Sequence, residues 1–205
     1  MTLIGSEPNF SMFNAFHRDA FSHGQILSKL WLCNELERLL TTESQTIWVY
    51  GGWYCLTNFL LRSRQLVSVK NLCSFDIDPD ATTNARIINN TWECEGTFRA
   101  FTYDCNTVDP STPWLYESEP PDIIINTATE HFDKKEWFNA IPSGTRVILQ
   151  SNDLAHDDHV GTVALSESVD ALIAMYPLRT IEFSGNKPFR YPQMSYDRYM
   201  VIGRK

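Results

Sequence analysis

The sequence predicts an α/β fold built on a doubly wound, mostly parallel sheet of seven strands. Along its 205 residues, short β-rich apolar segments alternate with segments of helical spacing, which is typical of parallel strands joined by helices. Two segments, 123–125 and 147–149, are continuous apolar runs, as expected of strands that helices cover on both faces. The chain ends in two successive strand-like segments, which predict an antiparallel C-terminal hairpin.

An N-terminal helix is expected from about Ser22 to Leu40. Ser22 and Gln25 have the spacing of a capping box, and apolar residues recur after them at helical intervals. These apolar residues are Ile26, Leu27, Leu30, Trp31, Leu36, Leu39 and Leu40. We expect residues 1–44 to form a helical cover on an α/β core at 45–205, within one domain.

The core is predicted to contain strands separated by helices. The strand segments are TIWVYG (46–51), VSVKNLCSFDID (67–78), FRAFTYD (98–104), PPDIIINTA (120–128), TRVILQSN (145–152), LRTIEFSG (178–185) and YDRYMVIGRK (196–205). Helical spacing marks 54–64, 79–91, 134–141 and about 166–175. For the second of these helices, Asp78 is a good N-cap and Pro79 fits the first helical position, where its missing N–H costs nothing.

Composition favours a soluble protein of a reducing compartment. No apolar run approaches the roughly 18 to 20 residues that span a bilayer, and the N-terminus lacks a basic start followed by an apolar signal core. The five cysteines form no C-x-x-C pair, and four of them lie in apolar or periodic segments, as buried thiols do. We therefore expect a cytoplasmic protein.

The charge of the chain argues against nucleic acid as its partner. A formal net charge of −8 opposes non-specific attraction to phosphate backbones. The alternative is a local basic groove, for which the candidates are Lys134, Lys135, Arg179, Lys187 and Arg190. His156 and His159, among Asp153, Asp157 and Asp158, have metal-ligating chemistry but the pattern of a solvated loop, so we expect no metal.

Glycines and acidic residues stand at the ends of successive strands of the predicted sheet. Gly51 and Gly52 come after the first strand, Asp76 ends the second about 25 residues later, and Asp104 ends the third. Ligands of such sheets bind outside the carboxyl ends of the strands, and an acid at this distance from a glycine turn accepts hydrogen bonds from ribose hydroxyls. A nucleoside-containing ligand is therefore predicted. The alternatives are helix capping for Asp76, a role that Asp78 already fits, and a solvated loop acid for Asp104.

The strand-end segments carry a resemblance to a known family. In order and spacing, VYGG (49–52), SFDIDPDA (74–81), FTYDCN (101–106) and DIIINTATEHF (122–132) resemble the class I S-adenosylmethionine-dependent methyltransferases. The resemblance covers about residues 45 to 205, with the N-terminal helix as an open extension. The chain looks most like the small methyltransferase-like proteins of tailed phages, and a phage-encoded protein of this kind would act in the host cytoplasm. The resemblance implies a Rossmann-like methyltransferase fold, S-adenosyl-L-methionine as cofactor, and transfer of a methyl group.

The resemblance also assigns roles to residues. Gly51 and Gly52 would approach the methionine part of the cofactor, Asp76 would hold the ribose, and Asp104 would contact the adenine edge. The implied cofactor-binding residues are Tyr50, Gly51, Gly52, Trp53, Asp76, Ile77, Asp104 and Asn126. The resemblance places Asn126 where the transferred methyl meets its acceptor, which the amide would orient. From their own chemistry, Glu130 or His131 is expected to take a proton from that acceptor, so the candidate catalytic residues are Asn126, Glu130 and His131.

Other residues are candidates for the same site, with structural alternatives. Gln150, Ser151 and Asn152 end the fifth strand and are expected to line the substrate pocket. The start of the N-terminal helix, with Lys29, would suit the carboxylate of the cofactor, although capping and solvation explain the same residues. Likewise Thr127 and Glu130 have the spacing of a capping box for a helix that begins near Phe132.

Two departures from the family pattern limit the functional prediction. The first motif of the family has the pattern acid-x-Gly-x-Gly-x-Gly, whereas this chain has Val49 at the acid and Trp53 and Cys55 at the later glycines. Either the cofactor sits differently, with Trp53 or Tyr54 lining its pocket, or the site no longer binds it. The chain also lacks the Asn/Asp-Pro-Pro-aromatic loop of enzymes that methylate base amino groups, which favours a small-molecule or protein acceptor. The alternatives are cleavage of S-adenosylmethionine and a non-catalytic binding protein.

Overall fold

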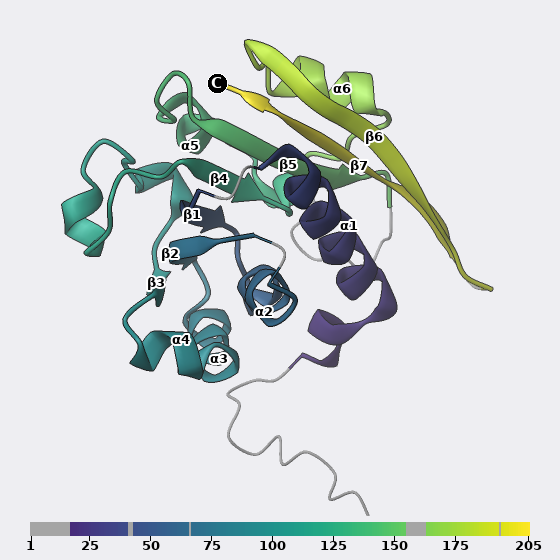
Figure 1. Cartoon of the computed structure of the whole chain (residues 1–205). Coiled ribbons are helices and arrows are strands. Elements are labelled where there is room, and N and C mark those ends of the chain that lie inside the picture. The colour runs from purple at the N-terminus through teal and green to yellow at the C-terminus, as the bar shows by residue number, and fades with distance from the viewer. Residues whose placement is uncertain (1–16, 41–42, 66, 155–162, 193) are drawn as a thin grey trace, which may run out of the picture.

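The computed structural model describes residues 17–40, 43–65, 67–154, 163–192 and 194–205, and these ranges contain one seven-stranded sheet (Figure 1). The strands are β1 (Gln45–Tyr50), β2 (Val69–Asp76), β3 (Phe98–Thr102), β4 (Ile123–Asn126), β5 (Arg146–Asn152), β6 (Thr180–Arg190) and β7 (Ser195–Arg204). Their order is β3-β2-β1-β4-β5-β7-β6. The first five strands are parallel, and β7 lies antiparallel between β5 and β6. The predicted fold, including its closing hairpin, is confirmed.

Helices lie on both faces of the sheet (Figure 1). They are α1 (His23–Leu39), α2 (Leu56–Ser63), α3 (Pro79–Ile88), α4 (Asn90–Cys94), α5 (Glu136–Asn139) and α6 (Val169–Met175). Short 3₁₀ turns, η2 (Arg18–Phe21), η3 (Cys105–Thr107), η4 (Pro113–Tyr116) and η5 (Thr129–His131), lie outside these helices. None of the helices in the described ranges is both long enough and apolar enough to cross a bilayer.

Alternation along the strands divides the core into two halves. In β1, Ile47 and Val49 pack on one face with Leu32 and Leu36 of α1, while Trp48 and Tyr50 pack on the other. The second face also holds Trp137 of α5 and Leu172 of α6. Residues Ile123 to Ile125 and Val147 to Leu149 are fully buried, as predicted for strands covered on both sides.

The predicted helix over 79–91 is divided into α3 and α4 at Asn89. Asp78 caps α3 by accepting a hydrogen bond from Asp80 N at 2.8 Å, and Pro79 occupies the first turn, both as predicted. Asn89 leaves the α-helical region at φ −102° and ψ 21°. Its buried side chain donates to Ala85 O at 2.8 Å and accepts from Asn58 Nδ2 at 2.9 Å. These bonds replace the continuing helix, which the periodicity alone did not indicate.

The cysteines lie as the sequence predicts. Cys33, Cys55, Cys73 and Cys105 are buried free thiols, and Cys94 is exposed. Burial raises the pKa of Cys33 and of Cys105 to about 12, so these thiols are protonated at neutral pH. They therefore act as apolar core residues.

Gln65 provides a test of backbone strain in the fold. It follows α2 as an exposed residue with a left-handed φ of 52°, which favours glycine. We expect Gln65→Gly to raise the free energy of unfolding by about 0.5–1 kcal/mol in urea denaturation. As a control, Ser63→Gly in the last turn of α2 should lower that free energy by about 0.5 kcal/mol. A loss of stability in both variants would contradict the strain at Gln65.

Candidate active site

A cavity of about 850 Å³ opens at the carboxyl ends of the parallel strands. The wall of the cavity contains residues at or just after the ends of β1 to β5, which are Gly51, Asp76, Asp104, Thr127 and Asn152. The start of α1 and the end of the β6–β7 hairpin complete the wall. This is the edge of a doubly wound sheet at which ligands bind.

The turn between β1 and α2 has glycine-type backbone geometry at three alternate positions. Gly51, Trp53 and Cys55 have φ values of 60°, 49° and 47°. These are the positions at which the methyltransferase pattern places its glycines. Trp53 and Cys55 thus hold a left-handed backbone that costs a non-glycine residue roughly 1–2 kcal/mol.

The two glycines of the turn lie close against neighbouring side chains. A Cβ on Gly52 would lie 2.0 Å from Ser74 Oγ, and a Cβ on Gly51 would lie 3.1 Å from the Phe132 ring. Gly52 N also donates to Phe75 O of β2 at 3.1 Å. The turn is thus held close against β2, with Gly51 at the cavity wall.

Asp76 joins this turn to the end of β2. Its Oδ2 accepts a hydrogen bond from Trp53 N at 2.7 Å, and its Oδ1 accepts from Asp78 N at 3.1 Å. Burial raises the pKa of the Asp76 carboxyl, while these backbone bonds act in the opposite direction. Since each carboxylate oxygen can accept more than one hydrogen bond, Asp76 can still accept bonds from a ligand in the cavity.

Asp104 and Ile77 stand beside Asp76 in the cavity wall. Asp104 accepts from both Asn106 N at 2.9 Å and Asn106 Nδ2 at 3.1 Å, so it caps the turn η3. Ile77 is 71% exposed, which gives the wall an apolar surface next to two carboxylates. A flat apolar group with polar edges matches this arrangement.

Most of the predicted site residues line the cavity, but two do not. The lining members are Gly51, Gly52, Trp53, Asp76, Ile77, Asp104, Glu130 and His131. Tyr50 is fully buried among Phe75 and Trp137, where burial raises the pKa of its phenol. Asn126 is buried behind the wall, and its Oδ1 accepts from Ala128 N at 2.9 Å. The positions of Tyr50 and Asn126 therefore do not support direct contact with a ligand, and such contact stays a prediction.

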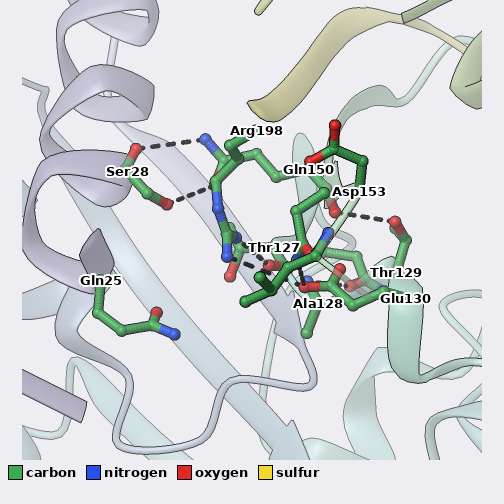
Figure 2. A network of polar contacts seen from close by, with 12 residues as sticks. Gln25, Ser28, Thr127, Ala128, Thr129, Glu130, Gln150, Asp153 and Arg198 are labelled. Atoms are coloured by element: carbon green, nitrogen blue, oxygen red, sulfur yellow. Dashed lines mark hydrogen bonds and ion pairs between the residues drawn. The ribbon is translucent and has the colours of Figure 1, made fainter. Parts of the chain in front are cut away.

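The loop after β4 differs from the prediction. No helix begins near Phe132, whose backbone is extended, and the turn η5 has no side-chain cap. The predicted capping box is wrong because no helix follows it and the Glu130 carboxylate has a partner on β5 instead. Glu130 is 4% exposed and accepts from Asn152 Nδ2, while Thr127 O accepts from Arg198 Nη1 at 3.2 Å (Figure 2).

Arg198 is the site residue that the sequence analysis missed. It lies on β7 opposite Asn152, it is 5% exposed, and its Nη2 is 3.9 Å from Glu130 Oε1. Figure 2 shows its guanidinium directed toward the loop that contains Thr127 and Glu130. The available sequence signal was an arginine inside the apolar run of the last strand, where a charge is rarely buried without a role.

A second polar group holds α1 on the sheet. Ser28 Oγ donates to Gln150 Oε1 at 3.0 Å, and Gln150 Nε2 donates to Ser28 O at 3.2 Å (Figure 2). Thr129 Oγ1 donates to Gln150 O at 2.8 Å, which attaches the loop after β4 to the same strand. Asn152 lines the cavity as predicted, whereas Gln150 and Ser151 lie outside its wall. Gln150 instead fixes the position of α1.

Lys29 brings a buried cation from α1 to the cavity. It is 7% exposed, and its Nζ donates to Gln25 Oε1 at 2.6 Å. Burial lowers the pKa of Lys29 to about 8, with a further contribution from Arg198 and opposing ones from Cys55, Glu130 and Asp19. An anion that enters the cavity beside Lys29 would therefore stabilise the charged form of its amine.

The histidine-rich loop after β5 lies outside the described residues from position 155 to 162. Asp153, which is described, accepts from Asp197 N at 2.7 Å and from Tyr199 Oη at 3.3 Å. Within the described ranges, no group of three or more His, Cys, Asp or Glu side chains is arranged to hold a metal ion.

Solved structures share the fold of this chain. The N-methyltransferase NodS of Bradyrhizobium japonicum WM9, in complex with S-adenosyl-L-homocysteine, matches with a TM-score of 0.62 at 12% identity, over 91% of this chain and 90% of its own. Magnesium protoporphyrin IX methyltransferase (ChlM) of Synechocystis PCC 6803, with bound S-adenosylmethionine, matches with a TM-score of 0.61 at 11% identity, over 93% and 85%. The chain has the fold of the class I S-adenosylmethionine-dependent methyltransferases.

Other comparisons limit what this methyltransferase fold implies. A putative RNA methyltransferase of Pyrococcus horikoshii matches with a TM-score of 0.55 at 12% identity, over 88% of this chain and 82% of its own. No protein-family model and no curated protein matches the sequence. The matched structures also give no support for the predicted likeness to phage proteins. Because the identities are this low, the likeness concerns the fold, and the function depends on the cavity.

Lys29 should make the stability of the protein depend on pH. Below pH 8 the folded state buries a charged amine, which lowers the free energy of unfolding. Between pH 8 and 10.5 the unfolded state binds more protons than the folded state, so this destabilisation by Lys29 declines as the pH rises. We expect Lys29→Met to raise the free energy of unfolding by about 3 kcal/mol at pH 7 and by less than about 1 kcal/mol at pH 10.

Urea denaturation of both proteins at the two pH values measures this difference, in which contributions common to both proteins cancel. Lys70→Met is the control, because Lys70 is half exposed and pairs with Glu119 at the surface. Its effect should be under about 1 kcal/mol at both pH values. A gain for Lys29→Met that does not change with pH would contradict the burial of a charged amine.

Proposed function

We propose that this protein is an S-adenosylmethionine-dependent methyltransferase that binds its cofactor at the ends of β1, β2 and β3. The observation that carries the proposal is Asp76, a carboxylate at the end of β2 that lines the cavity and holds the turn after β1. A carboxylate in this place is suited to accept hydrogen bonds from both hydroxyls of a ribose.

The neighbouring residues fit the rest of the cofactor. Gly51 and Gly52 line the cavity where the methionine part would lie, and Ile77 with Asp104 offers an apolar face and an acceptor for the adenine ring. Lys29 is suited to pair with the methionine carboxylate. Trp53, at a position where the family has glycine, is proposed to line the cofactor pocket.

The bound cofactor would supply a methyl group on a sulfonium, which moves to the acceptor by in-line displacement. The protein contributes mainly position and alignment, since such transfer gains most from holding the two reactants in line. Glu130 and His131 line the cavity next to the proposed cofactor site, and we propose that one of them takes a proton from the acceptor.

The acceptor is proposed to be a small molecule or a protein. The net charge of −8 disfavours nucleic acid, and of the five residues considered for a basic groove only Lys134 lines the described cavity wall. Arg190, another of the five, is engaged with Asp197 at 2.6 Å. Four buried free thiols support a cytoplasmic location for this activity.

Asp76 provides the test of the cofactor site. In calorimetric titrations with S-adenosylhomocysteine, we expect Asp76→Asn to weaken binding at least about tenfold, because a charged acceptor of two hydroxyl donors is lost. Asp109→Asn, which removes an exposed carboxylate outside the cavity, should leave the affinity within about twofold. Failure of the unmutated protein to bind S-adenosylmethionine or S-adenosylhomocysteine would exclude the proposed function.

Mass spectrometry of the S-adenosylmethionine mixture separates the alternatives. Intact cofactor in the absence of an acceptor is expected for a methyltransferase. Breakdown of the cofactor would instead support an enzyme of the same fold that cleaves it. The observation that favours this second function is the altered turn after β1, in which Trp53 and Cys55 stand at glycine positions.

A further inference from the structure

The part of the cavity around Arg198 has a chemistry of its own. We propose that it binds the methyl acceptor through a carboxylate, so that the substrate is a small organic acid with an apolar body. This inference rests on the proposed function, because it concerns the substrate of the same cavity. It is carried by the hydrogen-bonding state of Arg198 and by the balance of buried charge around it.

The guanidinium of Arg198 has one edge that donates a hydrogen bond and one edge for which the described residues supply none. Nη1 donates to Thr127 O at 3.2 Å, whereas Nε is buried without a hydrogen-bond partner among the described residues. Nη2 makes an ion pair with Glu130 Oε1 at 3.9 Å, beyond hydrogen-bond distance. Nε and Nη2 form the planar fork that binds a carboxylate through two parallel hydrogen bonds.

Glu130 does not satisfy this fork. Its Oε1 accepts from Asn152 Nδ2, and its Oε2 is buried without a partner in the described structure. Two charged side chains that are each at least 93% buried thus line one cavity with unused hydrogen-bonding atoms. Buried polar atoms are rarely left unpaired, so a ligand that supplies both an acceptor and a donor fits here. A carboxylate would accept from Arg198, and a hydroxyl or amine on the same molecule would donate to Glu130.

The buried charges also favour an anion. Lys29 and Arg198 are two buried cations beside one buried carboxylate, that of Glu130. Asp19 lies near Lys29 but is exposed to solvent. The proposed cofactor has a carboxylate, an ammonium and a sulfonium, and so adds a further positive charge. An acceptor with one negative charge offsets this excess, whereas a phosphate dianion would bring a second charge close to Glu130.

The walls beside Arg198 indicate the body of the molecule. Tyr191, Met194 and Tyr196 of the β6–β7 hairpin line the cavity, with Phe132 from the loop after β4. Aromatic and thioether side chains suit an apolar, preferably planar group. A hydroxylated aromatic acid combines all of these features.

The experiment compares acids with their neutral amides on protein saturated with S-adenosylhomocysteine. The probes are benzoate and 4-hydroxybenzoate, each with the corresponding benzamide, and binding is measured by calorimetry and by ligand-observed NMR. We expect at least one acid to bind tenfold or more tightly than its amide. Arg198→Gln should remove this preference, and Arg198→Lys should keep part of it, since the charge remains but the fork is lost.

Arg190→Gln is the matched control, because Arg190 lies on the same hairpin but outside the cavity wall, where it binds Asp197. It should leave the preference for acids unchanged. Thermal unfolding and the affinity for S-adenosylhomocysteine, measured for each variant, show whether the fold and the cofactor site remain intact. For the Arg198 variants we expect this affinity to stay within about threefold of the unmutated value.

Three results would overturn the inference while leaving the proposed function in place. They are equal binding of acid and amide, binding of neither, and a preference for acids that persists in a folded Arg198→Gln protein. A loss of more than tenfold in the affinity for S-adenosylhomocysteine in Arg198→Lys would assign Arg198 to the cofactor and would also contradict it. Failure of the unmutated protein to bind S-adenosylhomocysteine is a separate result, which concerns the proposed function.

Discussion

The hydrogen bond from Trp53 N to the Asp76 carboxylate is the interaction on which the geometry of the cavity depends. It joins the turn after β1 to the end of β2, and the parallel pairing of these strands brings both to one edge of the sheet. A bond to a charged acceptor contributes about 1.5–3 kcal/mol, comparable with the 1–2 kcal/mol that a left-handed tryptophan costs. Asp76 therefore stabilises, at position 53, a backbone that glycine adopts without strain.

The charges of the cavity are separated in a way that matches two different ligands. Asp76, Asp78 and Asp104 gather at the ends of β2 and β3, while Lys29 and Arg198 come from α1 and β7. Hydroxyl and amine donors suit the first group, and carboxylates suit the second. One cavity with these two ends can orient two reactants toward each other, which is what group transfer requires.

The strands and the strand-end residues were predictable from the sequence because both follow from local patterns. Apolar runs fix the strands, and the parallel topology then places Gly51, Asp76 and Asp104 at one edge without any knowledge of their contacts. Arg198 and the role of Glu130 were not predictable, since their contacts join residues 71 and 22 positions apart in the chain. The spacing of Thr127 and Glu130 fits a capping box equally well, and only the approach of β7 and β5 decides against it.

The difference between local patterns and contacts of distant residues also explains how this chain shares its fold with NodS and ChlM at 11–12% identity. A doubly wound sheet requires buried apolar strands and tight turns, and many sequences meet these requirements. In this chain Trp53 holds a left-handed backbone in the first turn, where its N–H donates to the nearby Asp76 carboxylate. The fold therefore constrains where a ligand can bind, whereas the chemistry of the cavity depends on buried side chains such as Arg198 and Glu130, which come from separate strands and loops.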